Sequence, residues 1–354
     1  MPKPTTILYI VIIGTCCGVI VVYLFWWAVS RFKVLTARER PLRARLQTLC
    51  RDVGAVERLD FRGGPGGRDG EPAPPFQFVE EHADGTSPCV SVRDARGRRW
   101  RVKWGDEVRS ESFAVRFVWA AGYHAEVAYF VARGRIEGAK GLTRAQECIG
   151  EDCSFADARF ELDDPAVRKL FDEHGWSWDE NPFAGTRELA GLKILLMLLS
   201  NWDNKDVRDV ARGSNTAIFE HTLEDGTIEA RYLIIDWGAT LGKWGSSLTR
   251  SKWDCAGFES QNAEFIKGVS EGVVEWGYTG QRTDEATEGI TVEDVRWFYA
   301  RLRRITDAQL RDGLLASGAS VEEAECFTRA LRERLERLRL IAERGGEEGV
   351  KGKG

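Results

Sequence analysis

Carboxylate and amide side chains gather in one stretch of this chain, between Thr186 and Gly242. A long apolar segment, Glu188 to Leu199, predicts a buried helix, and a polar run that includes Asp203 follows it directly. Two later apolar segments predict adjacent antiparallel strands; Asn215 opens the first strand and Asp236 follows the second. Polar groups at the ends of buried elements face a cleft while their backbones stay fixed. These side chains could orient a hydroxyl group or complete an oxygen-rich magnesium site.

A lysine and a glutamate form a second candidate pair nearer the N-terminus. The segments Val90 to Arg93 and Trp100 to Trp104 flank a turn sequence and predict a β-hairpin that carries Lys103. A helix predicted from Val108 to Ala121 carries Glu111 in its first turns. A strand lysine can neutralise nucleotide phosphates, and a helix glutamate behind it can hold the ammonium group by a charge-assisted hydrogen bond. Either residue alone is typical of a solvated surface charge, so the prediction depends on the pair and on the motifs that follow.

The order of these motifs resembles the protein-kinase-like fold of the atypical kind. It is similar to the HipA-type serine/threonine kinases, the phosphatidylinositol kinases and the secretory-pathway protein and glycan kinases. The resemblance covers about Phe76 to Leu340 and implies an α+β fold with two lobes. It also implies that Lys103 contacts the phosphates of ATP and that Glu111 is the partner of this lysine.

The same resemblance implies roles for the residues between the two lobes. The sequence NWDNK resembles the catalytic-loop pattern N-x-D-x-H, with Asp203 at the catalytic aspartate and Lys205 in the place of the histidine. Asn215 resembles the metal-binding asparagine, and Asp236, in the sequence DWG, resembles the metal-binding aspartate of the D-x-G motif.

The spacing within this loop departs from the family pattern. Asn215 lies twelve residues after Asp203, which is farther than the family spacing. Either the loop carries an insertion, or Asp206 or Asp209 binds the metal instead.

The resemblance implies an ATP-dependent kinase, which transfers the gamma-phosphoryl group to a hydroxyl acceptor with the help of Mg2+. A second hypothesis is a catalytically inactive pseudokinase scaffold that binds a partner at the membrane. It is favoured by Lys205 in place of a histidine, and by the lack of a glycine-rich lid before Lys103. A third hypothesis is a membrane-tethered α+β domain whose acidic cluster is structural.

The N-terminal region predicts a single membrane-spanning helix. Ile7 to Val29 contains 23 residues without a charge, enough to cross a bilayer core of ~30 Å at 1.5 Å per residue. The apolar run exceeds the usual length in a cleaved signal peptide, and no small-x-small cleavage site follows it. Arginine and lysine residues crowd its C-terminal side, so the positive-inside bias predicts a cytoplasmic body, with an extracytoplasmic body as the alternative.

The composition is that of a globular protein with ordinary charge. Its 354 residues are 43% hydrophobic and 30% charged, with a net charge of −5, and no basic stripe predicts nucleic-acid binding. The predicted organisation is a membrane anchor with flanks (1–34), a juxtamembrane helix and Gly/Pro-rich linker (35–75), a small lobe with β-hairpins and one helix (76–175), a helical large lobe with the catalytic and metal motifs (176–345), and a disordered tail (346–354).

Several further elements follow from local pattern. Leucine spacing predicts the juxtamembrane helix over Leu35 to Leu59, and Val127 to Val131 with Arg135 to Ile136 predicts another hairpin. Helices are predicted over Thr291 to Ile305 and Ser320 to Glu343, each beginning at a hydroxyl residue that can cap it. The six cysteines beyond the anchor have no zinc-site spacing and are interpreted as structural thiols, although their even number allows disulfides in an extracytoplasmic body.

Overall fold

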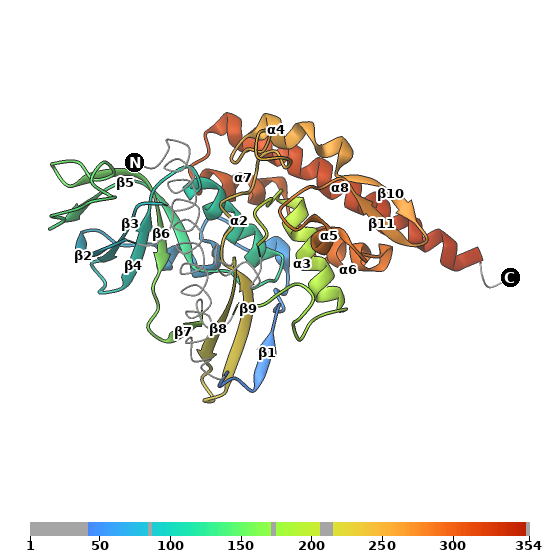
Figure 1. Ribbon diagram of the computed structural model, residues 1–354, viewed down its shortest axis with the longest axis horizontal. Helices are drawn as coiled ribbons and strands as arrows, with labels where there is room; N and C mark the ends of the chain where they lie inside the picture. The colour runs from blue at the N-terminus through green and yellow to red at the C-terminus, as the bar shows by residue number, and fades with distance from the viewer. Residues whose placement is uncertain (1–41, 84–86, 171–174, 206–214, 352–354) are drawn as a thin grey trace, which may run out of the picture.

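The structure is a computed structural model that describes residues 42–83, 87–170, 175–205 and 215–351, with side chains to residue 343. A β-rich part lies on the left of Figure 1 and a helical part on the right, with a second sheet between and below them. The fold is therefore mixed α+β. The predicted membrane-spanning segment, Ile7 to Val29, lies outside the described residues. Within the described ranges, no helix is both long and apolar enough to cross a bilayer.

Five strands close into a barrel in the order β2-β3-β4-β6-β5. Along β4, buried Trp100 and Val102 alternate with residues on the outer face, as the hairpin prediction requires. The predicted pairing of β3 with β4 is confirmed, with Val90 opposite Val102. The strands are β2 (Phe76–His82), β3 (Cys89–Arg93), β4 (Arg99–Lys103), β5 (Ala128–Glu137) and β6 (Ser154–Leu162).

The second predicted hairpin is wrong. The residues from Ala128 to Ile136 lie in the single strand β5, which pairs with β6. Its central Gly134 does not form a turn; a Cβ atom there would lie 2.5 Å from the ring of Phe155. A glycine inside a strand can mark such a close approach of a neighbouring side chain.

Helix α2 (Val108–Ala120) connects the barrel to the rest of the molecule. Almost every residue of α2 is buried, because the helix packs against β5 and β6 on one side and α7 (Asp307–Leu315) on the other. The helix ends before Gly122, whose φ of 88° is the left-handed conformation expected at a helix stop. Both the helix and its stop were predicted, and its first turn is thereby fixed next to β4.

A four-stranded sheet in the order β1-β9-β8-β7 supports the other half of the candidate site. Strands β8 (Thr216–Thr222) and β9 (Ile228–Ile234) are antiparallel, as predicted, with Thr216 opposite Ile234. Strand β7 (Val167–Leu170) pairs with β8, and β1 (Leu46–Thr48) runs parallel to β9.

The predicted juxtamembrane helix is wrong over the residues that the structure describes. Residues 42–59 contain β1 and a short 3-10 turn, Val56–Arg58, instead of a helix. Leucines three and four apart suggested a helix, but this backbone bonds to β9 through Arg45 and Leu46–Thr48. The following glycine-rich segment was predicted as a loop or linker and contains two short 3-10 turns, Gly64–Gly66 and Arg68–Gly70. It packs on the barrel, where Tyr129 donates a hydrogen bond of 2.7 Å to the carbonyl oxygen of Gly67.

The helical part is built around α3 (Arg187–Leu198) and the long helix α8 (Val321–Lys351). Thr186 caps α3, and the predicted capping residues Thr291 and Ser320 both accept a hydrogen bond from the third residue of their helices. The remaining elements are α4 (Cys255–Ser260), β10 (Ile266–Ser270), β11 (Val273–Trp276), α5 (Thr283–Thr287) and α6 (Val292–Leu302).

Buried Arg334 joins the two main helices of this part. It extends from α8 and donates hydrogen bonds to the carbonyl oxygen of Leu198, at 3.0 Å, and to Ser200, at 2.7 Å. These groups lie at the C-terminal end of α3, where carbonyl oxygens lack helical partners and a positive charge is favourable. Arg334 therefore fixes the point from which the chain enters the polar run at Asn201.

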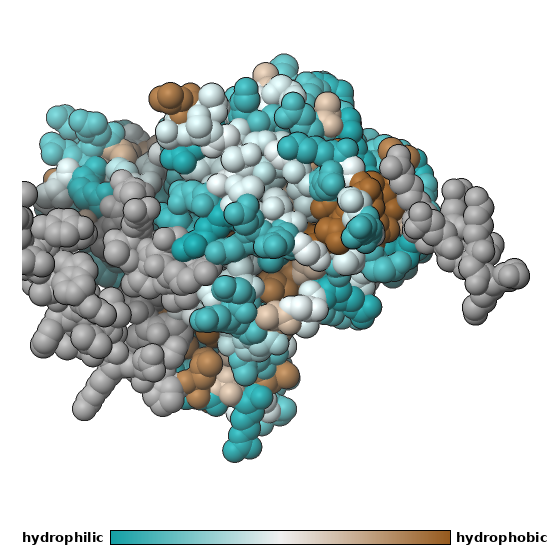
Figure 2. Space-filling view, turned by 45° about the vertical axis from the view of Figure 1, so that its right-hand side comes forward, coloured by the Kyte–Doolittle hydropathy of each residue, from teal (hydrophilic) through white to brown (hydrophobic). Residues whose placement is uncertain are grey.

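A disulfide bond joins Cys255 in α4 to Cys326 in α8, and four other cysteines of the described chain are free thiols. The prediction of structural thiols therefore holds for those four and is wrong for this pair. Figure 2 shows hydrophilic residues over most of the face that it presents, with separate hydrophobic patches. Isolated exposed apolar residues of this kind are normal on globular proteins.

Candidate active site

Three carboxylates from two elements meet at one point. One oxygen atom each from Glu107, Glu111 and Asp236 lie within 4.8 Å of one another. Glu107 and Glu111 are one turn apart at the start of α2, so they project from the same helix face. Asp236 arrives from the other side, two residues after β9 ends. The start of α2 and the aspartate of the DWG sequence therefore lie side by side in the structure.

Burial and mutual repulsion disfavour ionisation of Asp236 and Glu111. The pKa of Asp236 is raised by burial and then by the negative charge of Glu107. Burial also raises the pKa of Glu111, although Arg159 and Lys103 oppose this effect. A divalent cation between them would relieve the repulsion, and a set of oxygen ligands suits Mg2+ better than a softer metal. The residues present therefore fit the predicted metal.

Lys103 shares this environment at the end of β4. It lies on the outer face of the barrel, which α2 covers, and the carboxylate of Glu111 is the main reason that the pKa of Lys103 is raised. Lys103 also interacts with Asp236, whose pKa it lowers. The structure therefore brings Asp236 together with Lys103 and Glu111, which lie far from it in the sequence.

The ion pair of Glu111 differs from the expectation. Its carboxylate lies 3.1 Å from a guanidinium nitrogen of Arg159, and no ion pair within 4.0 Å joins it to Lys103 among the described residues. Arg159 lies opposite Lys103 in the β4–β6 register, so their side chains emerge from the same face. Two like charges side by side there are destabilising unless carboxylates compensate them.

Those carboxylates form a buried ion network with Arg159 at its centre. Besides Glu111, Arg159 lies 3.0 Å from Glu161 and 3.6 Å from Glu126. Lys169 from β7 lies 3.0 Å from Glu161 and 3.8 Å from Glu126. Lys169 and Arg159 hold the pKa of Glu161 well below its ordinary value despite burial, while burial and the charge of Glu161 raise that of Glu126 to about 8.

The predicted catalytic loop is held by side-chain amides. Asn201 donates a hydrogen bond of 3.0 Å to the carbonyl oxygen of Asp236, and its own amide oxygen accepts from the backbone nitrogen of Asp203 at 3.3 Å. Asn215 donates a hydrogen bond of 2.5 Å to the carbonyl oxygen of Asp203. Since the Nδ2 atom of Asn215 is engaged in this way, its Oδ1 atom is the one that can face a cation.

The carboxylate of Asp203 has two partners. Gln281 donates a hydrogen bond of 2.5 Å to its Oδ1 atom, and the ammonium group of Lys205 lies 3.8 Å from the same atom. Buried Tyr278 donates a hydrogen bond to the carbonyl oxygen of Asn201 and so helps to fix the predicted catalytic loop. The carboxylate is therefore oriented, and it contributes to the electrostatic environment of Asp236.

Helix α2 is docked directly on the DWG segment. Ser110 donates a hydrogen bond of 2.7 Å to the carbonyl oxygen of Gly238. A Cβ atom at Gly238 would lie 2.6 Å from the carboxyl carbon of Glu107, so this position requires glycine. Lys252 pairs with Glu107 at 2.7 Å on the outer side of the cluster. The backbone of the DWG segment therefore determines where the carboxylate of Glu107, at the start of α2, lies.

Three residues of the site escaped the sequence analysis: Glu107, Arg159 and Gln281. Glu107 had a local signal, because it lies directly before the predicted helix and four residues before Glu111. Arg159 and Gln281 had none, since their roles depend on strand register and on a segment distant in sequence. Asp206 and Asp209, the alternative metal ligands, lie outside the described residues.

The chain matches no protein-family model and no curated protein sequence. Among solved structures, it is similar to the complex of Rio2 kinase with ADP/Mg2+ and phosphoaspartate from Chaetomium thermophilum. The match covers 73% of this chain and 72% of that chain, with 15% sequence identity and a TM-score of 0.28. A likeness this small assigns neither a family nor an activity, so the argument for a function depends on the site.

Proposed function

We propose that this protein is a kinase-like phosphotransferase that moves the gamma-phosphoryl group of ATP to a hydroxyl acceptor. The observation that carries the proposal is the meeting of Lys103, Glu111 and Asp236, which come from a strand, a helix and a loop. A lysine beside a set of carboxylates can hold nucleotide phosphates and their metal ion in one place. Positioning and electrostatic stabilisation of this kind supply most of the catalysis in phosphoryl transfer.

Each residue of the site has a role in this proposal. Lys103 binds phosphate oxygens, and Glu111 and Arg159 set the position and charge of that lysine. Asp236 and Asn215 would hold Mg2+, which would offset the negative charge of the phosphate groups. Asp203 orients the acceptor hydroxyl and accepts its proton. Gln281 and Lys205 fix that carboxylate by the contacts described above.

A pseudokinase scaffold is the second candidate, and one observation favours it. Glu111 forms its ion pair with Arg159 and lies farther than 4.0 Å from the ammonium nitrogen of Lys103. A lysine without this direct partner is less well fixed for binding phosphates. In this candidate the same fold binds a partner at the membrane and turns over no ATP.

Nucleotide binding by the full-length protein separates the two candidates. We expect ATP to bind only with Mg2+, and saturating ligand at 100 times its dissociation constant raises stability by about 2.7 kcal/mol. The variants Asp236→Asn and Lys103→Ala should lose this binding because they remove a metal ligand and a phosphate ligand. Asp225→Asn and Lys140→Ala are matched controls at exposed positions and should bind as the wild type does.

The outcomes have distinct meanings. Binding that both site variants lose supports the nucleotide site, and transfer of labelled phosphoryl to an alcohol then tests the enzyme. Binding that survives in both variants would contradict the roles of Asp236 and Lys103. A folded wild type that binds no ATP with Mg2+ would refute the kinase and leave the scaffold.

We also propose that Ile7 to Val29 anchors the protein in a membrane. The arginine-rich flank favours a cytoplasmic body, whereas the Cys255–Cys326 disulfide favours an oxidising compartment, because cytosolic disulfides are rare. Alkylation of intact cells with a membrane-impermeant maleimide, after mild reduction, tests the orientation. Labelling of these two cysteines would place the body outside, and labelling only after lysis would place it in the cytoplasm.

A further inference from the structure

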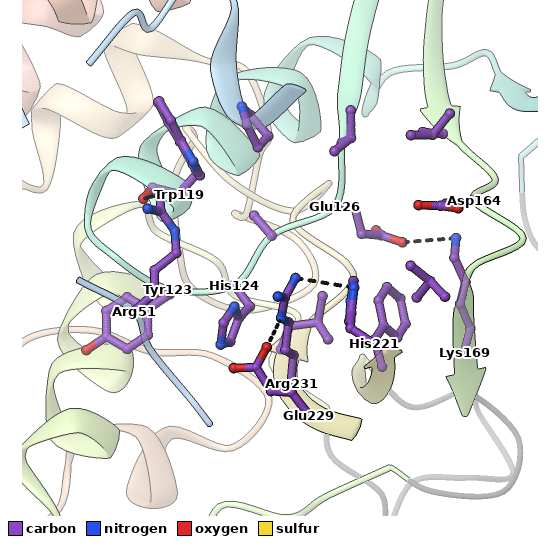
Figure 3. Close-up of a pocket in the computed structure, with 17 residues that line it drawn as sticks. Arg51, Trp119, Tyr123, His124, Glu126, Asp164, Lys169, His221, Glu229 and Arg231 are labelled. Carbon is purple, nitrogen blue, oxygen red and sulfur yellow. Dashed lines mark hydrogen bonds and ion pairs between the residues drawn. The ribbon is translucent and has the colours of Figure 1, made fainter. Parts of the chain in front are cut away.

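A cavity of about 310 Å3 lies on the far side of the ion network from the acidic cluster. It is bordered by the end of α2, by β7, β8 and β9, and by the segment after β1 (Figure 3). Glu126 and Lys169 form one wall, and ion pairs through Arg159 and Glu161 connect these two residues to Glu111. None of the residues assigned to the proposed transfer lines the cavity, so it is a separate site.

The opposite wall carries Arg51, a cation without an ion pair among the described residues, although the charge of neighbouring Asp52 acts on it. Arg51 forms no ion pair with any residue that the structure describes; it donates to the carbonyl oxygen of Trp119 at 2.7 Å and lies over the Trp119 ring. Burial lowers the pKa of Arg51, and the positive charges of Arg301 and Arg231 lower it further. The other two cations of the cavity are paired: Arg231 with Glu229 at 2.6 Å and Lys169 with Glu161 at 3.0 Å. An anion would therefore find its partner at the Arg51 end.

Two neutral histidines lie between these walls, and their hydrogen bonds fix their tautomers. Arg231 can only donate, so the Nδ1 atom of His221, 3.3 Å away, accepts and the proton lies on Nε2. Thr48 donates its hydroxyl proton to Glu229 at 2.8 Å, so its oxygen accepts from the Nε2 atom of His124 at 2.9 Å. His221 thus has a ring N–H, and His124 a ring lone pair, that these contacts leave available.

The cavity is amphipathic along its length. Figure 3 shows Arg51 and Lys169 at opposite sides, with His124, Arg231 and His221 between them. Near Lys169, whose ammonium lies 5.3 Å from the ring centre of Phe219, the lining includes apolar side chains. These apolar residues are Val127, Leu162, Val167, Phe219 and Leu233.

We propose that this cavity binds a small amphipathic organic anion, a carboxylate or a phosphate monoester. Its acidic group contacts Arg51 and Arg231, its polar atoms reach the imidazole of His221, and its apolar body lies against Phe219 and Leu233. The volume is at the lower end of the range for small-molecule sites, about 300 to 1,000 Å3, so a single ring fits and a nucleotide does not. The carboxylates of Glu126 and Asp164, near Lys169, disfavour a second charged group at the end away from Arg51.

Calorimetric titration of the full-length protein tests the proposal with benzoate and phenyl phosphate as anions and benzyl alcohol as a neutral analogue. We expect one anion bound per chain and no heat from the alcohol. Arg51→Gln should bind about tenfold more weakly or worse, because a charged hydrogen bond is lost from a desolvated site. Arg311→Gln, at an exposed position of α7, is the matched control and should bind as the wild type does.

Two further variants keep the test decisive. Ala125→Phe places a ring in the cavity and should abolish binding even if Arg51→Gln fails to fold. Asp236→Asn should bind benzoate normally, which separates this cavity from the proposed nucleotide site. The proposal is overturned if the folded wild type binds neither anion, if the alcohol binds equally well, if a folded Arg51→Gln or Ala125→Phe variant binds unchanged, or if Asp236→Asn loses binding.

Discussion

The acidic cluster and the cavity lie on either side of one buried ion network, and their charges are opposite. On one side, Glu107, Glu111 and Asp236 crowd negative charge, and burial makes that of Asp236 and Glu111 costly. On the other, Arg51 and Arg231 crowd positive charge, and Arg51 has no carboxylate partner in the described chain. Between them, cations and carboxylates alternate and compensate one another. The comparison separates charges that are paired within the fold from charges that are placed to bind a ligand.

Replacing the centre of the network should cause the largest effect. Arg159→Met leaves Glu111, Glu126 and Glu161 buried without their shared counter-ion. Breaking a buried ion pair by removing one partner costs about 3 to 5 kcal/mol. We expect the free energy of unfolding, measured by urea denaturation, to fall by that amount.

A matched substitution tells whether this loss comes from the network or from arginine in general. Arg135 lies on the neighbouring strand β5 and pairs with Asp152 at 3.9 Å, and both side chains are 64% exposed. Arg135→Met should change the free energy of unfolding by less than about 1 kcal/mol. Equal losses in the two variants would contradict a special role for the network.

Local pattern was enough for much of the fold. The β3–β4 alternation, the Gly122 stop and the capping residues Thr291 and Ser320 depend on neighbours within a few positions, and the structure has them all. The β1 strand could not be predicted in this way. Its partner is distant, as the hydrogen bond from Thr48 to Glu229 across 181 positions shows, and its leucine spacing also suits a helix.

The candidate site shows the same division between features set by local pattern and features set by distant contacts. Motif order gave Lys103 and Glu111 as a pair and Asp236 as a metal ligand, and the three residues lie together in the structure. It could not predict that Glu111 pairs with Arg159, since this depends on the register of β4 with β6. No local sequence signal marks Arg51 either. Its importance comes from the lack of a carboxylate partner in the described chain, which the sequence does not show.

A smaller effect sharpens the description of the acidic side. Glu107→Gln removes one of three carboxylates while Asp236 and Glu111 remain. If Glu107 helps to hold the cation, the affinity for Mg2+ in the presence of ATP should fall about tenfold, or about 1.4 kcal/mol. Titration of Mg2+ at fixed ATP measures this.

The neighbouring cation gives the control for that experiment. Lys252→Met removes the outer partner of Glu107 at 2.7 Å and leaves all three carboxylates in place. It should not weaken Mg2+ binding, because the cluster becomes more negative. If Lys252→Met binds Mg2+ more weakly than Glu107→Gln does, Glu107 serves only as the ion-pair partner of Lys252 and does not hold the cation.

The smallest effect concerns the pH dependence of stability on the cationic side. Burial, and then the charge of Arg231, lower the pKa of His124 from 6.5 to about 4. Arg51 and His221 add to this, whereas Glu229 opposes it. The unfolded chain therefore binds more protons than the folded chain between these values, so stability is full above pH 6.5 and declines toward pH 4. His124→Gln, which keeps a donor for Thr48, should reduce the loss between pH 7 and pH 6 by about 0.5 kcal/mol.

Denaturation at the two pH values, with and without saturating benzoate, measures this contribution. A bound anion offsets Arg51 and Arg231 and thereby raises the pKa of His124, so the wild type should lose less stability on acidification when benzoate is present. The His124→Gln variant should show a smaller benzoate effect because one responsive group is gone. If wild type and His124→Gln lose the same stability on acidification, the positive charges of the cavity do not act on His124. The contrast between the acidic cluster and the cavity would then depend on Arg51 alone.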